Sequence, residues 1–138
     1  MGFKDLLVHL DHHDGSRRAL DFAALLAAQH QAHLTALHAF EIPIPSLLAV
    51  PEETALGRTT REAELLRQAA LIRAASLRTV FEETIGRQGI AGEWRQVEAS
   101  AHTLAPLHAR YADLAIFGRS TSDGDRWDGA SLVEAVLF

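Results

Sequence analysis

The residues best suited to binding chemistry lie near the end of the chain, between positions 112 and 131. The apolar run from Leu114 to Phe117 predicts a buried strand, which Gly118 ends. A polar loop with further glycines follows, and Ser131 begins a helix. Backbone N–H groups at a helix start are unpaired and carry partial positive charge, which favours phosphate. This order of strand, loop and helix start predicts an anion site.

A second candidate, Asp11, ends the first apolar run of the chain. An aspartate at the end of a strand has two interpretations here, and the sequence leaves both open: it contacts a ligand, or it caps the N–H groups of the following loop. The residues that we expect around a ligand in this corner are Asp11, the end of the second strand near Ala39, Gly118, Arg119, Ser120 and Ser131.

Other clusters of reactive side chains have simpler interpretations. Residue types that bind zinc or nickel gather near the first loop and on the next strand: His9, His12, His13, Asp14 and His38. However, the side chains of adjacent strand residues point apart, and histidines in loops are usually solvated. We interpret His9 and His38 as core residues. The run 123–129 lacks the spacing of a calcium loop, and the hydroxyl run 120–122 lacks a nucleophile elbow. We therefore expect neither a metal nor a catalytic residue.

Composition restricts the class of protein. The chain has 138 residues, 48% of them hydrophobic, which suits a single domain over residues 1–138. The formal net charge of −5 argues against nucleic acid as a partner. There is no cysteine, so thiol chemistry is excluded. We recognise neither a secretory signal nor a membrane-spanning run, so we expect a cytoplasmic protein without a membrane partner.

Strand and helix patterns alternate along the chain. The predicted strands are 6–10, 32–40, 93–98 and 113–118, and the predicted helices begin at Asp14 or Ser16, near 61, near 102 and at 131. Prolines at 43, 45 and 51 favour a loop over 41–60. The alternation predicts a Rossmann-like α/β fold, an open parallel sheet with helices on both faces. Ligands bind such sheets where the strand order reverses, and the first and fourth strands are natural neighbours there.

The predicted elements end on an apolar helix over 131–138, where the alternation calls for one further strand. An unpaired sheet edge promotes aggregation. We therefore expect that the final strand is missing because the chain is part of a longer protein, or that a partner supplies it.

Four segments, spread over nearly the whole chain, resemble the universal stress protein family. They are 4–11 (KDLLVHLD), 33–38 (HLTALH), 92–95 (GEWR) and 108–118 (HARYADLAIFG). The resemblance implies a five-stranded parallel sheet and a dimer. It is strongest to the proteobacterial type, which often carries two such domains in tandem, so a second universal stress domain is an expected partner.

Family members that bind ATP carry a loop of three spaced glycines and a final Ser or Thr after the fourth strand. Gly118 matches the first glycine and Ser131 the final residue, but Thr121 and Ala130 stand at the other two glycines, and the spacing is one residue short. A side chain there obstructs the approach of backbone to phosphate. The loop also holds three aspartates against two arginines. Asp11 matches the family's acidic residue at the end of the first strand, which accepts from an adenosine or ribose group.

The resemblance thus implies a non-catalytic stress-response or regulatory module that acts by dimerisation or by binding a partner. The alternative function is binding of ATP or another adenine nucleotide, with at most slow hydrolysis.

Overall fold

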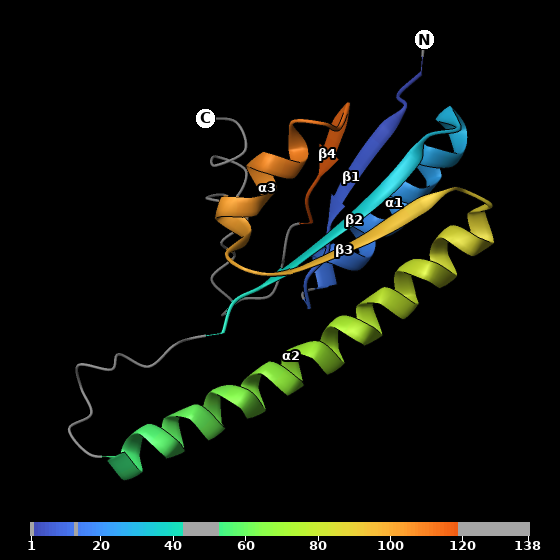
Figure 1. Cartoon of the computed structure of the whole chain (residues 1–138). Coiled ribbons are helices and arrows are strands. Elements are labelled where there is room, and N and C mark those ends of the chain that lie inside the picture. Colours follow the sequence, from blue (N-terminus) through green and yellow to red (C-terminus); the bar gives the residue numbers. More distant parts are fainter. Residues whose placement is uncertain (1, 13, 43–52, 119–138) are drawn as a thin grey trace.

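The computed structural model describes residues 2–12, 14–42 and 53–118 (Figure 1). Strands and helices alternate in this part of the chain, as predicted. They are β1 (Asp5–His9), α1 (Asp14–His30), β2 (His33–Phe40), α2 (Glu53–Gln88), β3 (Gly92–Glu98), α3 (Ala101–Ala109) and β4 (Leu114–Ile116). The predicted helix over 131–138 lies outside the described residues, and the missing fifth strand stays a prediction.

The four strands form one parallel sheet in the order β3-β2-β1-β4. The chain builds outward from β1 to β2 and β3, and then returns to place β4 on the other side of β1 (Figure 1). The predicted contact between the first and fourth strands is therefore confirmed, and the strand order reverses between them. Leu6 pairs with Leu114 and Val8 with Ile116 across this boundary.

The period of two along the strands divides the core between the two faces of the sheet. Leu6, Val8 and Leu10 join the larger cluster, which packs against the alanine-rich inner side of α1 and against Phe81 of α2. Leu7 faces the opposite way and joins a smaller cluster with α3. Helices α1 and α2 thus cover one face and α3 the other, as the sequence predicts (Figure 1).

The start of β4 is fastened to the start of β1 by Asp113. Its Oδ2 accepts hydrogen bonds from the backbone N–H groups of Lys4 at 2.7 Å and Asp5 at 3.0 Å. These bonds lower the pKa of the Asp113 carboxyl group. Strand β4 is shorter than the predicted strand over 113–118. In the described part of the chain it pairs only with β1, and this pairing covers three residues.

Helix α2 departs from the prediction at both ends. It begins at Glu53 rather than near residue 61, because the helix-breaking prolines stop at position 51. The glycines at 86 and 89 predict the end of this helix, but the helix continues through Gly86. The end lies at Gln88 and is followed by Gly89 at φ 66°, a conformation that suits glycine.

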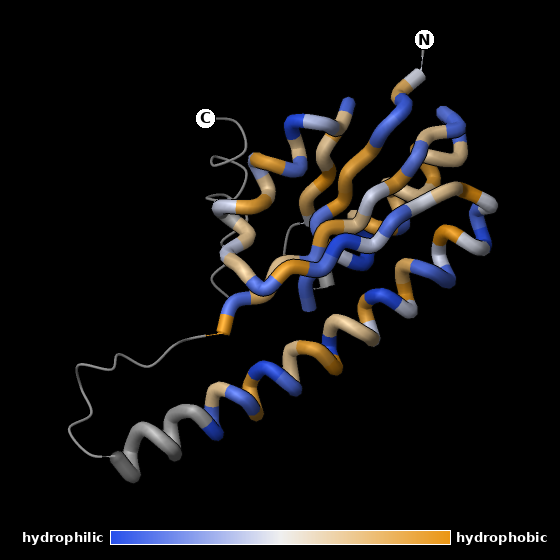
Figure 2. Tube along the Cα trace, in the orientation of Figure 1, coloured by the Kyte–Doolittle hydropathy of each residue, from blue (hydrophilic) through white to orange (hydrophobic). Residues whose placement is uncertain are grey.

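The inner side of α2 is buried only where the sheet lies against it. The helical spacing of Leu66, Ala70, Ala74 and Phe81 predicts one buried face. Ala70, Ala74 and Phe81 are buried, but Leu66 is 48% exposed. Figure 1 shows the first turns of α2 extending past the sheet, and Figure 2 shows hydrophobic positions along the helix. Among the described residues, no helix has the length and apolar character needed to cross a membrane.

Candidate functional site

The carboxyl ends of β1 and β4 meet the first turn of α1, and Gly118 lies at this junction. A Cβ atom on Gly118 would stand 2.3 Å from the carbonyl oxygen of Gly15 and 2.6 Å from the backbone nitrogen of Ser16. Real Cβ atoms do not approach backbone so closely, so only glycine fits. The sequence singled out Gly118 for a phosphate loop, and the structure adds a second reason: the backbone of the β4 end packs directly on the start of α1.

Asp11 is fixed in the same corner by reciprocal hydrogen bonds with Ser16. The hydroxyl of Ser16 donates to Asp11 Oδ1 at 2.7 Å and accepts from the Asp11 backbone N–H at 2.9 Å. Ser16 is buried, whereas the side chain of Asp11 is 31% exposed. The geometry thus orients a partly accessible carboxylate at the carboxyl end of β1, and Ser16 is the positioning residue that the sequence prediction left out of the site.

The predicted site residues are brought together only in part. Asp11 and Gly118 both border Ser16. Ala39 belongs to the carboxyl end of β2, the strand beside β1, and pairs with Val97 of β3. It therefore shares the edge of the sheet with Asp11. Arg119, Ser120 and Ser131 lie outside the described residues.

His38 is a buried core residue whose ring is hydrogen-bonded, which confirms its interpretation from the sequence. Its Nδ1 lies 2.8 Å from the carbonyl oxygen of Leu10. A carbonyl only accepts, so Nδ1 carries the proton and the ring donates. Burial lowers the pKa of His38, and the ring stacks between Phe40 and Trp94 at centroid distances of 5.9 and 5.8 Å. The histidine therefore supports the end of β1 from the neighbouring strand.

His9 is also buried, with its ring 6.0 Å from that of Phe117 and its Nδ1 4.0 Å from Asp11 Oδ2. Within the described residues, no three histidine, aspartate or glutamate side chains gather as a metal site would require. His13 and the side chain of Asp14, which belonged to the candidate metal cluster, lie outside that description.

A small cavity of about 170 Å³ adjoins the corner between α1 and α2. Asp11, His12, Ser16 and Arg17 supply its polar wall, and leucine and valine side chains close the other sides. Arg17 is exposed, and its guanidinium adds a positive charge to the first turn of α1. Sequence reasoning also missed Arg17, although its place directly after the loop that follows β1 was visible.

Taken together, the parallel sheet and the reversal of strand order between β1 and β4 define an open α/β domain, a fold class in which ligands bind where the strand order reverses. Comparison with family models then shows which family the chain belongs to. Residues 2–104 match the model of the universal stress protein family, so the chain belongs to that family. This confirms the resemblance seen in the sequence. A search of curated protein sequences found no match to the chain.

Solved structures of universal stress proteins share the fold. The protein UspA from Lactobacillus plantarum is 18% identical, with a TM-score of 0.63 over 99% of this chain and 92% of its own. A universal stress protein from Archaeoglobus fulgidus, in complex with dAMP, is 18% identical, with a TM-score of 0.59 over 99% and 91%. A third, in complex with cAMP, is 20% identical, with a TM-score of 0.57 over 84% and 76%. At these identities the likeness establishes the fold.

Proposed function

We propose that this chain is a non-catalytic regulatory domain that binds an adenine mononucleotide at the corner of Asp11, Ala39 and Gly118. The observation that carries this proposal is the junction of Gly118 with Gly15 and Ser16. It sets Gly118, the last described residue after β4, against the first turn of α1, whose Ser16 also orients the carboxylate of Asp11. A carboxylate at this position suits the hydroxyl groups of a ribose, and the start of the β4 loop suits a phosphate.

Two observations favour one phosphate over three. Thr121 and Ala130 replace glycines that a triphosphate loop needs, and the loop holds more acidic than basic residues. Two relatives of the same fold were solved with cAMP and with dAMP, each of which has a single phosphate. Arg119, Ser120 and Ser131 are the proposed phosphate contacts.

Calorimetric titration tests this proposal with AMP, cAMP and ATP as ligands. We expect micromolar binding of AMP or cAMP, which corresponds to roughly 8 kcal/mol, and weaker binding of ATP. Asp11→Asn keeps the shape of the side chain and its bond from Ser16 but removes the charge, so it should weaken binding about tenfold or more. Asp21→Asn, at an exposed position of α1, is the matched control and should bind as the original does. Absence of heat from all three nucleotides in a folded sample would contradict the proposal.

A second candidate function, assembly with another copy or with a partner, has its own observation. Helix α2 carries large apolar side chains in water: Leu65, Leu66, Leu71 and Ile72, of which Leu65 is 65% and Ile72 is 70% exposed. Leu65 and Ile72 are seven residues apart and therefore lie on one side of the helix. Exposed apolar groups that gather in this way mark interaction surfaces.

Sedimentation equilibrium tests the assembly function. If this surface holds a dimer together, Leu65→Glu combined with Ile72→Glu should convert it to monomer, because two charges would have to be buried. Gln88→Glu, at the far end of the same helix, should leave the mass unchanged. A monomer in the original chain, or a dimer that survives the double change, would rule out self-association through this surface.

A further inference from the structure

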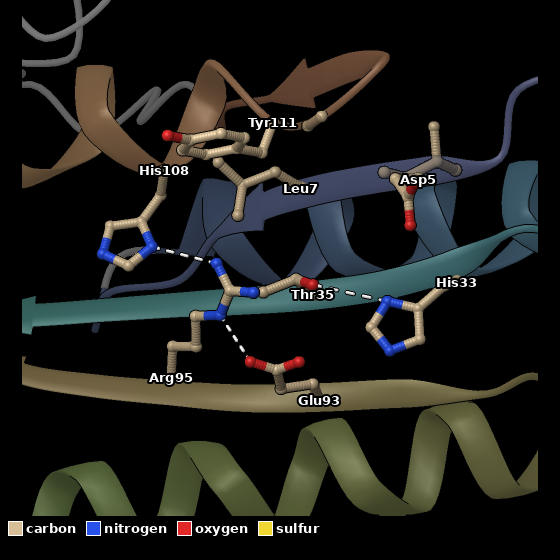
Figure 3. A pocket seen from close by; sticks show the side chains of 10 residues that line it. Asp5, Leu7, His33, Thr35, Glu93, Arg95, His108 and Tyr111 are labelled. Atoms are coloured by element: carbon tan, nitrogen blue, oxygen red, sulfur yellow. Dashed lines mark hydrogen bonds and ion pairs between the residues drawn. The ribbon is translucent and has the colours of Figure 1, made fainter.

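A second cavity lies on the α3 face of the sheet toward the starts of the strands, whereas the Asp11 corner lies at their carboxyl ends. Its volume is about 390 Å³, within the usual range for sites that hold small molecules. Leu7 and Thr35, both buried, form its floor, and the surrounding side chains come from the starts of β1, β2 and β3 and from the end of α3 (Figure 3). The cavity exists because α3 packs over Leu7 and Leu37 and leaves the first half of β2 and β3 uncovered.

One side of this cavity is basic. Arg95 Nε donates to Glu93 Oε1 at 2.5 Å, and Arg95 Nη1 lies 3.0 Å from His108 Nδ1 (Figure 3). A guanidinium only donates, so His108 Nδ1 accepts and the ring is neutral, with its proton on Nε2. Burial and the charge of Arg95 lower the pKa of His108, in agreement with this state. The guanidinium N–H groups of Arg95 that are not directed at Glu93 or His108 thus supply donors on this side.

The other side is acidic. Figure 3 shows Asp5 at the end of the cavity away from His108, with Glu93 between the two ends. His33 pairs with Asp5 across the strands, and its Nδ1 lies 3.5 Å from the hydroxyl of Thr35. The pocket therefore has the Asp5 carboxylate at one end and the guanidinium of Arg95, paired with Glu93, toward the His108 end.

An aromatic wall completes the cavity. Tyr111 lines it on the side of α3 and is 84% exposed, although its ring is large and mostly apolar. Figure 3 shows the ring near Leu7 and His108. A ligand with a flat apolar group would shield the Tyr111 ring from water.

We propose that this cavity binds a small zwitterion, an α-amino acid with an aromatic side chain. Its carboxylate would accept from Arg95, which His108 holds in place, its ammonium group would donate to Asp5 and Glu93, and its ring would lie against Tyr111. An inorganic anion would meet two carboxylates in this pocket, and a simple cation would meet the guanidinium. A molecule that carries both charges matches both ends, because each charge faces its opposite.

Titration of L-phenylalanine into the full chain, followed by calorimetry, tests this site. We expect saturable binding, and we expect both N-acetyl-L-phenylalanine and L-phenylalanine amide to bind at least tenfold more weakly, because each lacks one of the charges. Arg95→Gln should cause a similar loss, whereas Arg87→Gln, on α2 and outside the cavity, should cause none. If Arg95→Gln does not fold, the two derivatives decide the question with the original chain.

Failure to bind phenylalanine at about 10 mM, well above a millimolar dissociation constant, would overturn this proposal. Equal binding of phenylalanine and its two derivatives would also overturn it. Since Asp11 lies outside the lining of the cavity and at the other end of the strands, Asp11→Asn should not change phenylalanine binding. The outcome of this test is therefore independent of the nucleotide proposal.

Discussion

Two glycines with opposite surroundings test the packing of the site at the level of single residues. A Cβ on Gly118 would meet backbone of α1, whereas one on Gly86 would meet nothing within 4 Å. Gly118→Ala should lower the free energy of unfolding by about 1–3 kcal/mol, because the β4 end must move away from α1. Gly86→Ala should raise it by roughly 1 kcal/mol, because alanine favours the helix interior.

Urea unfolding followed by circular dichroism measures both changes. A Gly118→Ala variant as stable as the original would show that the contact between the β4 end and Gly15 is not formed in solution. Gly86→Ala serves as the control for the general effect of replacing glycine by alanine.

His38 should make stability depend on pH. Burial lowers the pKa of the folded imidazole below its ordinary value of 6.5. The unfolded chain therefore binds a proton at higher pH than the folded chain, so the free energy of unfolding should fall as the pH is lowered through about 6.5. His38→Asn retains an N–H that can reach the Leu10 carbonyl but does not titrate, and it should reduce this slope.

Urea unfolding between pH 7.5 and 5 measures the slope for both proteins. Part of it should persist in His38→Asn, because the lowered pKa of His108 acts in the same direction. An identical slope in the variant and the original would mean that His38 titrates alike in both states.

At the residue scale, the sequence predicted Asp11 and Gly118 from their types and from their places at strand ends. It could not predict how the two are joined. Gly118 contacts Gly15 and Ser16, about a hundred positions earlier in the chain, and this contact exists only after the sheet forms. The same holds for the bond between Arg95 and His108, which links a strand to a helix. Local patterns identify the participants, but tertiary packing sets their partners.

At the scale of single elements, the residue that directly follows α1 is strained. Gln31 has φ 53°, in the left-handed region, and Ala32 N–H donates to the Ala27 carbonyl at 2.9 Å. The end of α2 has the same arrangement, with Gly89 at the corresponding place and Ile90 N–H bonded to the Ile85 carbonyl. A side chain in this conformation costs roughly 1–2 kcal/mol, which glycine avoids.

Gln31→Gly should therefore raise the free energy of unfolding by up to about 1 kcal/mol, after allowance for the greater freedom of glycine in the unfolded chain. Thermal unfolding followed by circular dichroism measures the change. A lower melting temperature would contradict the left-handed conformation at Gln31. Gln29→Gly, two positions earlier and inside α1, is the control and should destabilise.

The order and type of the elements were predictable because their periodicities differ clearly, two for the strands and 3.6 for the helices. The first residue of α2 was not, since prolines mark where a helix cannot be and leave its start undefined. Leu66 shows a further limit. Its spacing from Ala70 predicts burial, but the spacing does not reveal that the sheet ends before the helix does.

At the scale of the whole molecule, the two cavities and the corner are consequences of one topology. The return of the chain from β3 to β4 places α3 on the face away from α1 and α2. That return creates the junction of β1, β4 and α1, and it leaves part of the α3 face open. The topology that forms this junction is that of the family fold. The lining of the open part of the α3 face depends on the particular residues of β3 and α3.

The most direct test of the central proposal is an amide NMR titration of the labelled 15.1 kDa protein with AMP. Binding at the corner predicts the largest shifts at Asp11, Ser16, Ala39 and Gly118, because their amides lie at the carboxyl ends of the strands and at the start of α1. Shifts confined to Thr35, Arg95 and His108 would place the nucleotide in the second cavity and not in the corner. Shifts at neither place, with AMP at millimolar concentration, would contradict nucleotide binding by this domain.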